Sequence, residues 1–239
     1  MTVVSVDLAY TDWHYIGVAL LTREQAGVRA RLVKPPTGRP LANDVAEWVA
    51  RLAERHGARI ILLDGPQAWK GSATSDPIKR LSEKAFNTPS KTGLPSVVKP
   101  APYTAFTVFS IAVFDALHRL AWPRLTNPAQ AGERFTIESY PHASWKGLGI
   151  VPLPSKSKAR PDDLRRVRRE LAQRLGVVVD GDPSHDELQA VVAGLGGLAL
   201  DSGNVEKVRF AGEEPYLEAG IWREGFIVVP CLAPQHSTP

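Results

Sequence analysis

The feature that most constrains this chain is an acidic residue inside an apolar strand near its start. Residues 2–9 read TVVSVDLA, a run that is β-branched and almost entirely apolar around Asp7. Such a run suits a strand buried on both faces in the middle of a sheet. Taking an ionised carboxylate out of water costs several kcal/mol unless a cation or hydrogen-bond donors compensate it. Asp7 therefore needs a partner, and the functional edge of a sheet would supply one.

Asp7 also has a simpler interpretation. After Tyr10-Thr11-Asp12 the apolar pattern resumes over residues 13–21, close enough in sequence to fold back as a hairpin. The Asp7 carboxylate could then end its strand and accept hydrogen bonds from the backbone amides of that turn. The strand alone leaves both interpretations open.

Composition places the chain among ordinary globular proteins. Its 239 residues are 23% charged and 44% hydrophobic, which suits one large domain with a substantial core. No apolar run is long enough to span a membrane, and the first residues do not form a signal segment, so we expect a cytoplasmic protein. Cys231 is the single cysteine, which excludes an intramolecular disulfide and a thiolate zinc cluster. The net charge of +4 permits an anionic partner, and nothing in the sequence specifies an oligomeric state.

Periodicity predicts strands that alternate with helices. The predicted strands cover residues 2–9, 13–21, 27–34, 58–66 and 135–141. The predicted helices cover residues 41–55, 76–86, 103–120, 161–174 and 188–200. These elements imply a single domain over residues 1–230, with a polar insertion at about 67–102, a C-terminal hairpin at about 220–230 and a tail at 231–239.

Three further acids stand where predicted strands end or the last helix begins. Asp64 and Glu138 each close a strand, and Asp186 lies at the opening of the last helix. Because a strand–helix–strand connection normally gives a parallel pair, Asp64 should lie beside Asp7. Each acid also has a local explanation, since Asp before Gly-Pro forms turns and the helix dipole favours acids in a first turn.

Taken together, the four acids predict a metal site. Clustered carboxylates raise one another's pKa unless a divalent cation lies between them. Oxygen ligands without cysteine favour Mg²⁺ or Mn²⁺ over Zn²⁺. Two such ions about 3.5–4 Å apart can activate a water and stabilise the leaving oxygen in phosphodiester hydrolysis. We therefore expect a nuclease whose metal ligands and catalytic residues are Asp7, Asp64, Glu138 and Asp186.

Two basic stretches supply candidate contacts to DNA or RNA. The polar insertion interleaves basic and aromatic residues, as a groove for a phosphate backbone does. The second stretch runs from a proline-punctuated loop into the helix that begins at residue 161. Each could instead be a solvated surface that is merely basic. The candidate contacts are Lys79, Arg80, Lys91, Lys156, Lys158 and Arg165.

Six short motifs are spread over nearly the whole chain. They are Val6-Asp7 with Trp13, Leu63-Asp64-Gly65-Pro66, Lys79-Arg80 with Glu83, Glu138-Ser139-Tyr140-Pro141, His185-Asp186, and EGFIVVP at 224–230. Their order resembles the ribonuclease H-like fold and, more narrowly, the DUF429 family of predicted nucleases. The resemblance implies an α/β fold in which three antiparallel strands precede parallel ones in a mixed sheet, with helices on both faces.

One position departs from this resemblance. Related nucleases often carry a second acid three residues into the last helix, where this chain has the uncharged Gln189. A second hypothesis is therefore a catalytically weak nucleic-acid-binding or scaffolding protein of the same fold. A third is a small-molecule phosphotransferase, because Gly194-Leu195-Gly196-Gly197 invites comparison with a phosphate loop. His142 and His185 could carry protons, although hydrogen-bonded structural roles are the simpler interpretation.

Overall fold

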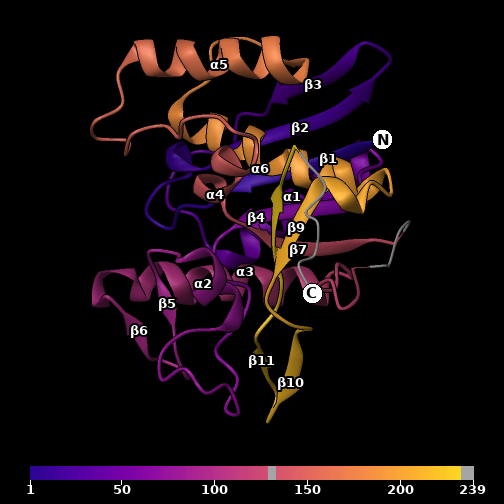
Figure 1. Cartoon of the computed structure of the whole chain (residues 1–239). Helices are drawn as coiled ribbons and strands as arrows, with labels where there is room; N and C mark the ends of the chain where they lie inside the picture. The colour runs from indigo at the N-terminus through magenta and orange to yellow at the C-terminus, as the bar shows by residue number, and fades with distance from the viewer. Residues whose placement is uncertain (129–132, 233–239) are drawn as a thin grey trace.

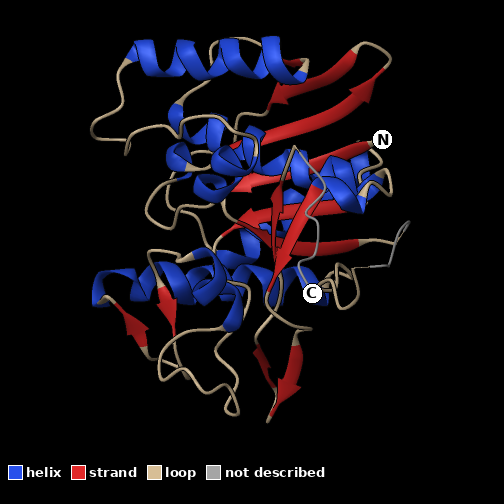
Figure 2. Ribbon diagram, in the orientation of Figure 1, coloured by secondary structure: helices blue, strands red, loops and turns tan. Residues whose placement is uncertain are grey.

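An eight-stranded mixed sheet forms the centre of the computed structural model, which describes residues 1–128 and 133–232. The strand order is β8-β3-β2-β1-β4-β7-β12-β9, and helices cover both faces of the sheet (Figures 1 and 2). The first three strands are antiparallel, and β4 and β7 run parallel to β1. This order and these directions are those of the ribonuclease H-like fold, as predicted. The five strands that the sequence analysis predicted are β1 (Thr2–Asp7), β2 (Gly17–Glu24), β3 (Gly27–Leu32), β4 (Ile60–Asp64) and β7 (Phe135–Ser139).

Three strands that the sequence analysis did not assign to the sheet complete it. β8 (Val177–Val179) pairs with β3, and β12 (Ile227–Pro230) pairs with both β7 and β9 (Val208–Ala211). The predicted hairpin at 220–230 is therefore wrong in its pairing. The actual hairpin is β10 (Tyr216–Glu218) with β11 (Ile221–Arg223). Glu224 and Gly225 have φ values of 56° and 113°, so the chain turns away from the hairpin before it enters the main sheet.

Each face of the sheet has its own hydrophobic core. Val4, Val6 and Leu63 pack with α1 (Ala42–Arg55) and α3 (Thr104–Arg119) on one face. Val3 and Leu62 point to the other face, because successive residues of a strand face opposite ways. That second face is covered by α4 (Pro141–Gly147), α5 (Pro161–Leu175) and α6 (His185–Asp201).

The small residues of α6 let this helix lie directly on the sheet. A Cβ at Gly194 would come within 2.4 Å of Leu21 Cδ1, and a Cβ at Gly197 within 2.3 Å of Leu62 Cδ1. Both glycines lie in the middle of the helix and are packing residues. The phosphate-loop interpretation is therefore wrong, because such a loop places its glycines before a helix N-terminus.

The predicted insertion is an ordered layer at one side of the sheet. It contains α2 (Leu81–Phe86), β5 (Lys91–Thr92) and β6 (Val98–Lys99), and Figure 1 shows it beside the β10–β11 hairpin. The N–H of Trp69 donates to the carbonyl of Trp222 at 3.0 Å, and the N–H of Glu224 donates to the carbonyl of Trp69 at 2.8 Å. The insertion is therefore tied by its backbone to the hairpin.

Three short 3₁₀ turns connect these elements: η1 (Trp13–Tyr15), η2 (Ala101–Tyr103) and η3 (Val205–Lys207). Of the tail expected at 231–239, only residues 231 and 232 are among those described. Across the described parts of the chain, no helix combines the length and apolar character needed to cross a bilayer.

The close approach of α6 to the sheet predicts opposite effects for two glycine substitutions. Gly194→Ala should lower the free energy of unfolding by about 1–3 kcal/mol, because its Cβ would overlap Leu21 and lie 3.0 Å from Ser5 Cβ. Gly196→Ala should be neutral or raise it by up to about 1 kcal/mol, because its Cβ would meet Pro230 at the ordinary distance of 3.4 Å. Equilibrium unfolding in urea checks the pair, and equal effects would contradict this packing.

Candidate functional site

The carboxyl ends of β1 and β4 bring Asp7 and Asp64 side by side. The two residues are register partners in the parallel ladder, and Ser139 is the partner of Asp64 on β7. Asp7 lies an even number of residues after Val3, and Asp64 an even number after Leu62, so each aspartate points to the same face of the sheet as that apolar residue. The side chains of Asp7, Asp64 and Ser139 therefore form a row on the face that α6 covers. The predicted meeting of Asp7 and Asp64 is confirmed by the sheet register.

Gly17 allows the start of α6 to reach this row. It pairs with Asp7 across the antiparallel ladder, and a Cβ at this position would lie 2.2 Å from the carbonyl carbon of Asp186. No side chain fits between the strand and the helix start. The helix begins with a capping box in which Ser184 Oγ accepts from the N–H of Glu187, and Glu187 accepts from the N–H of Ser184 at 2.7 Å. The backbone thus fixes Asp186 next to the strand that carries Asp7.

The Asp7 and Asp64 carboxyls share a site that disfavours two charges. Burial raises the pKa of Asp7 well above its usual range, and the charges of Asp64 and Asp186 raise it further, whereas Lys156 acts to lower it. Burial raises the pKa of Asp64 to about 7, against the lowering effect of its hydrogen bond with Asp7. Within the described residues neither carboxyl forms an ion pair. The negative charge of the pair can therefore be compensated by a proton or by a bound cation.

Asp186 is the third member of this group and is already paired. It accepts a hydrogen bond from Lys156 Nζ, and its Oδ1 lies 3.3 Å from His185 Nδ1. Burial acts to raise the pKa of Asp186, but the hydrogen bonds from His185 and Lys156 outweigh it and lower the pKa. His185 Nε2 lies 3.0 Å from the carbonyl oxygen of Pro154. This geometry matches the structural interpretation of His185.

Glu138 lies at the same edge of the sheet but faces another partner. Its register partner on β4 is Leu63, so its side chain points to the face opposite to that of Asp64. Its two oxygens accept hydrogen bonds from the Arg80 guanidinium at 2.8 and 2.9 Å, and one also accepts from the N–H of Gln67 at 3.0 Å. The expectation that Glu138 ligates a metal with the other acids is not met, because its oxygens are already bound.

Arg80 is fully buried, so its predicted contact with phosphates is wrong. Its guanidinium also bonds to Glu83, 3.1 Å from Nε. The nearby Glu224 is buried as well and accepts from the backbone N–H groups of Gly71 and Leu81. Together, Arg80, Glu83, Glu138 and Glu224 form a buried charge cluster. It locks α2 and the rest of the insertion to β7 and to the turn before β12.

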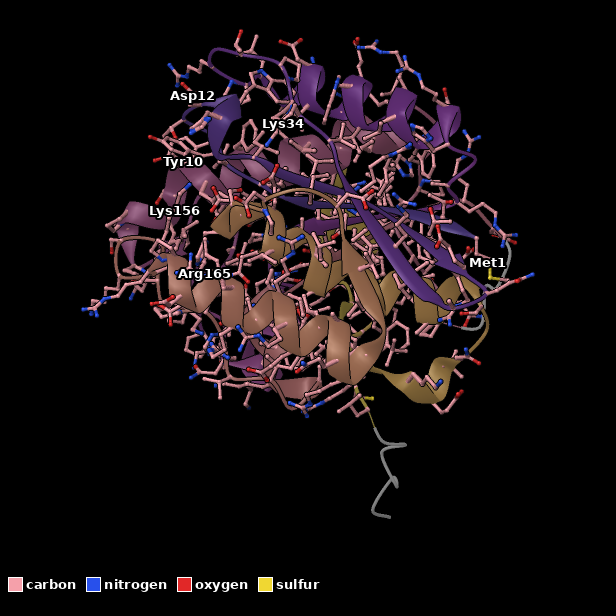
Figure 3. All side chains as sticks on the ribbon, turned by 90° about the horizontal axis from the view of Figure 1, so that it is seen from above. Met1, Tyr10, Asp12, Lys34, Lys156 and Arg165 are labelled. Atoms are coloured by element: carbon pink, nitrogen blue, oxygen red, sulfur yellow. The ribbon has the colours of Figure 1, made fainter. Side chains whose placement is uncertain are left out.

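The other basic candidates differ in their surroundings. The side chains of Lys156 and Arg165 are 50% and 66% exposed, and Figure 3 places both on the same side of the molecule as Tyr10, opposite Met1. Lys34, which the sequence analysis did not single out, lies nearer the middle of that view and donates to Glu187. Of the remaining candidates, Lys158 is exposed, Lys79 is half-buried, and Lys91 donates to the carbonyl of Thr88 within the insertion.

Two hollows flank the acid pair. One, of 440 Å³, is reached by Asp64 and Ser139 and is walled by the insertion and α3. The other, of 570 Å³, is more open and is lined by Asp7, Asp186 and Lys156. Leu8 and Ala9 line both hollows. The start of the loop after β1 therefore separates a more enclosed space from an exposed groove.

The donor chemistry of Asp7 and Asp64 fits a hard cation such as Mg²⁺ or Mn²⁺. In residues 1–128 and 133–232, no three His, Cys, Asp or Glu side chains are already arranged as a metal cage. One oxygen of the Asp186 carboxylate accepts a hydrogen bond from Lys156. Gln189 does not extend the set, since its Oε1 accepts from Trp145 Nε1 at 2.7 Å. A bound cation would thus have Asp7 and Asp64 as free ligands, and Asp186 could become a third ligand only by releasing Lys156.

Two solved structures are similar to the chain. One is a Thermus thermophilus RuvC structure, with a TM-score of 0.45 and 12% sequence identity, covering 89% of this chain and 99% of that one. The other is T. thermophilus RuvC in complex with Holliday junction substrate, with a TM-score of 0.42, 14% identity and the same coverage. No protein-family model and no curated protein matches the chain. Since both TM-scores and identities are low, the function proposed below depends on the geometry of the site.

Proposed function

We propose that this protein is a metal-dependent nuclease that hydrolyses phosphodiester bonds in DNA or RNA. The observation that carries the proposal is the half-buried pair of Asp7 and Asp64, two hydrogen-bonded carboxyls that lack an ion-pair partner among the described residues. The start of α6 adds Asp186 to this pair. The site lies at the carboxyl ends of parallel strands, where ligands bind in open α/β sheets.

The contacts of each residue indicate its role in this proposal. Asp7 and Asp64 would hold the ion, and Asp186 would join them when Lys156 leaves it. A divalent cation held there supplies a polarised water and stabilises the leaving oxygen of a phosphodiester. Lys156 also lies 4.2 Å from the centre of the Tyr15 ring, which keeps its ammonium at the open groove. From that position it can bind a phosphate once it has released Asp186.

Glu138 would then act through the backbone. Its oxygen accepts from the N–H of Gln67, three residues after Asp64, while Arg80 holds its carboxylate in place. The turn that follows β4 is therefore fixed from the opposite face of the sheet. In this proposal Glu138 and Arg80 are positioning residues for Asp64.

The nucleic acid would meet the exposed cations on the same side of the molecule. Lys156 and Arg165 are exposed there, and Lys158 lies in the same loop as Lys156. We also propose that the chain belongs with the DUF429 group of predicted nucleases, on the strength of the six motifs. Asp7, Asp64 and Asp186 are the residues of those motifs that meet at the site.

A non-catalytic nucleic-acid-binding protein of the same fold is the second candidate. The observation that favours it is Gln189, which occupies the position of a possible fourth acid and is bound to Trp145. A two-metal site needs enough negative charge to hold both ions. Three carboxylates, one of which is paired with a lysine, supply less negative charge than four carboxylates would.

Removing either member of the acid pair should abolish metal binding. Asp7→Asn and Asp64→Asn keep the size of each side chain but remove its charge, so Mn²⁺ uptake measured by calorimetry should disappear. Cleavage of a labelled oligonucleotide should fall by at least about 10²-fold, as expected when a group that stabilises transition-state charge is lost. Asp44→Asn, an exposed acid on α1, is the matched control and should leave both measurements unchanged.

The outcomes separate the candidates. A wild-type protein that takes up neither Mg²⁺ nor Mn²⁺ would rule out the metal-dependent nuclease. Uptake of Mn²⁺ that depends on Asp7 and Asp64, without cleavage of single- or double-stranded DNA or RNA, would support the non-catalytic candidate instead.

The raised pKa of Asp64 predicts how stability depends on pH in the absence of metal. Its pKa is about 7 in the folded protein and about 4 in an unfolded chain, so the folded state binds more protons between these values. The contribution of Asp64 to stability should therefore fall as the pH rises from about 4 to about 7. Thermal melts in EDTA at constant ionic strength should show this decline, and Asp64→Asn should reduce it. Mn²⁺ at pH 8 should restore stability to the wild type only, and a decline of equal slope in the variant would contradict the assignment.

A further inference from the structure

The 440 Å³ cavity beside Asp64 has the size of a small-molecule site. Its walls come from the loop after β1, the insertion, α3 and the end of β7. Its volume lies within the range of roughly 300–1,000 Å³ that is usual for ligand pockets. Tyr103, Phe106 and Tyr140 present aromatic rings to it. A flat, unsaturated ligand fits this lining better than an aliphatic or a highly charged one.

The charges that line the cavity exclude a phosphate. Asp64, Glu83 and Glu138 are among the residues that line it, whereas no Lys, Arg or His is. The groove on the other side of Leu8 and Ala9 contains Lys156. A nucleotide bound at the acid pair would therefore keep its phosphate in the groove with Lys156 and place its uncharged part in the cavity.

We propose that this cavity receives one unstacked nucleobase of the strand that is cut, so that the substrate is single-stranded or locally unpaired nucleic acid. The proposal rests on the nuclease function proposed above and deepens it. Aromatic side chains bind unpaired bases by stacking, with little dependence on the sequence. A base inside an intact duplex must first be unstacked and unpaired, which costs free energy. The cavity therefore selects against intact duplex.

Binding in EDTA tests the cavity without the need for cleavage. Fluorescence anisotropy with the full chain should show tighter binding of a short labelled single strand than of the same sequence as a duplex. Phe106→Leu keeps an apolar side chain but removes the aromatic ring, and it should weaken single-strand binding by at least about fivefold. Val108→Ala is the control, because Val108 is on the same helix, is 47% exposed and does not line the cavity.

Tyr103→Leu provides a second variant should Phe106→Leu fail to fold. Tyr103 lines the same cavity and is only half-buried, so the loss of its ring should weaken single-strand binding by at least about fivefold. A thermal melt close to that of the wild type shows that the variant is folded.

An abasic residue moved along the oligonucleotide identifies the base that enters the cavity. At one position the missing base should weaken wild-type binding about as much as Phe106→Leu does. The Phe106→Leu variant should then bind this abasic oligonucleotide almost as well as the wild type does, because the missing base and the missing ring remove the same interaction. Equal loss at every position in both proteins would overturn the proposal.

The remaining outcomes distinguish this proposal from the nuclease function. Metal-dependent cleavage with equal binding of single strand and duplex, unaffected by Phe106→Leu and Tyr103→Leu, would overturn the base pocket and leave the nuclease. Preferential single-strand binding that is sensitive to both variants, without cleavage in Mg²⁺ or Mn²⁺, would support the pocket and overturn the nuclease.

Discussion

The proximity of two carboxyl groups at the ends of β1 and β4 is the interaction on which the site depends. Asp7 and Asp64 are direct neighbours in the parallel ladder, half-buried and hydrogen-bonded to each other. A protein selected only for stability would not place two acids there, since like charges that are partly removed from water disfavour each other's ionisation. The surrounding backbone holds the pair in place: Gly17 pairs with Asp7 and leaves the space in which the start of α6 lies. The site is thus built by close packing of backbone as much as by its acids.

A second group of buried charges stabilises the other face of the same sheet edge. Arg80 is held by Glu83 and Glu138, and Glu224 accepts hydrogen bonds from backbone amides of the insertion. Removing one member of such a cluster leaves buried charge without its partner, which is more costly than the loss of an exposed ion pair. The cluster explains how a polar segment with two short strands and a short helix remains attached to the sheet and forms the wall of the cavity next to Asp64.

Much of the fold followed from apolar periodicity, whereas the site followed only in part. The buried runs that end in Asp7 and Asp64, separated by a helix, were sufficient to predict a parallel pair with adjacent acids. The sequence could not predict that Glu138 faces away from Asp64. A shift of one residue along a strand reverses the face of a side chain, and periodicity does not resolve strand ends to one residue. The nearby Glu83 is one partner of Arg80, but the burial of Arg80 could not be predicted, since its other partner, Glu138, is distant in sequence. Short strands such as β8 and β9 owe their pairing to neighbours already in the sheet.

The distribution of charge around the acid pair fixes the direction from which a polyanion can approach. On the side of the cavity, Glu83 and Glu138 add negative charge, and the guanidinium of Arg80 that offsets them is completely enclosed. On the side of the groove, Lys156 is exposed and bound to Asp186, and Arg165 lies on the same side of the molecule. Exposed cations attract phosphates, and enclosed ones cannot contact them. Under the proposed function, the backbone of a nucleic acid would therefore lie in the groove. Its bases would then face the aromatic wall beyond Leu8 and Ala9, and the two hollows would be complementary parts of one binding site.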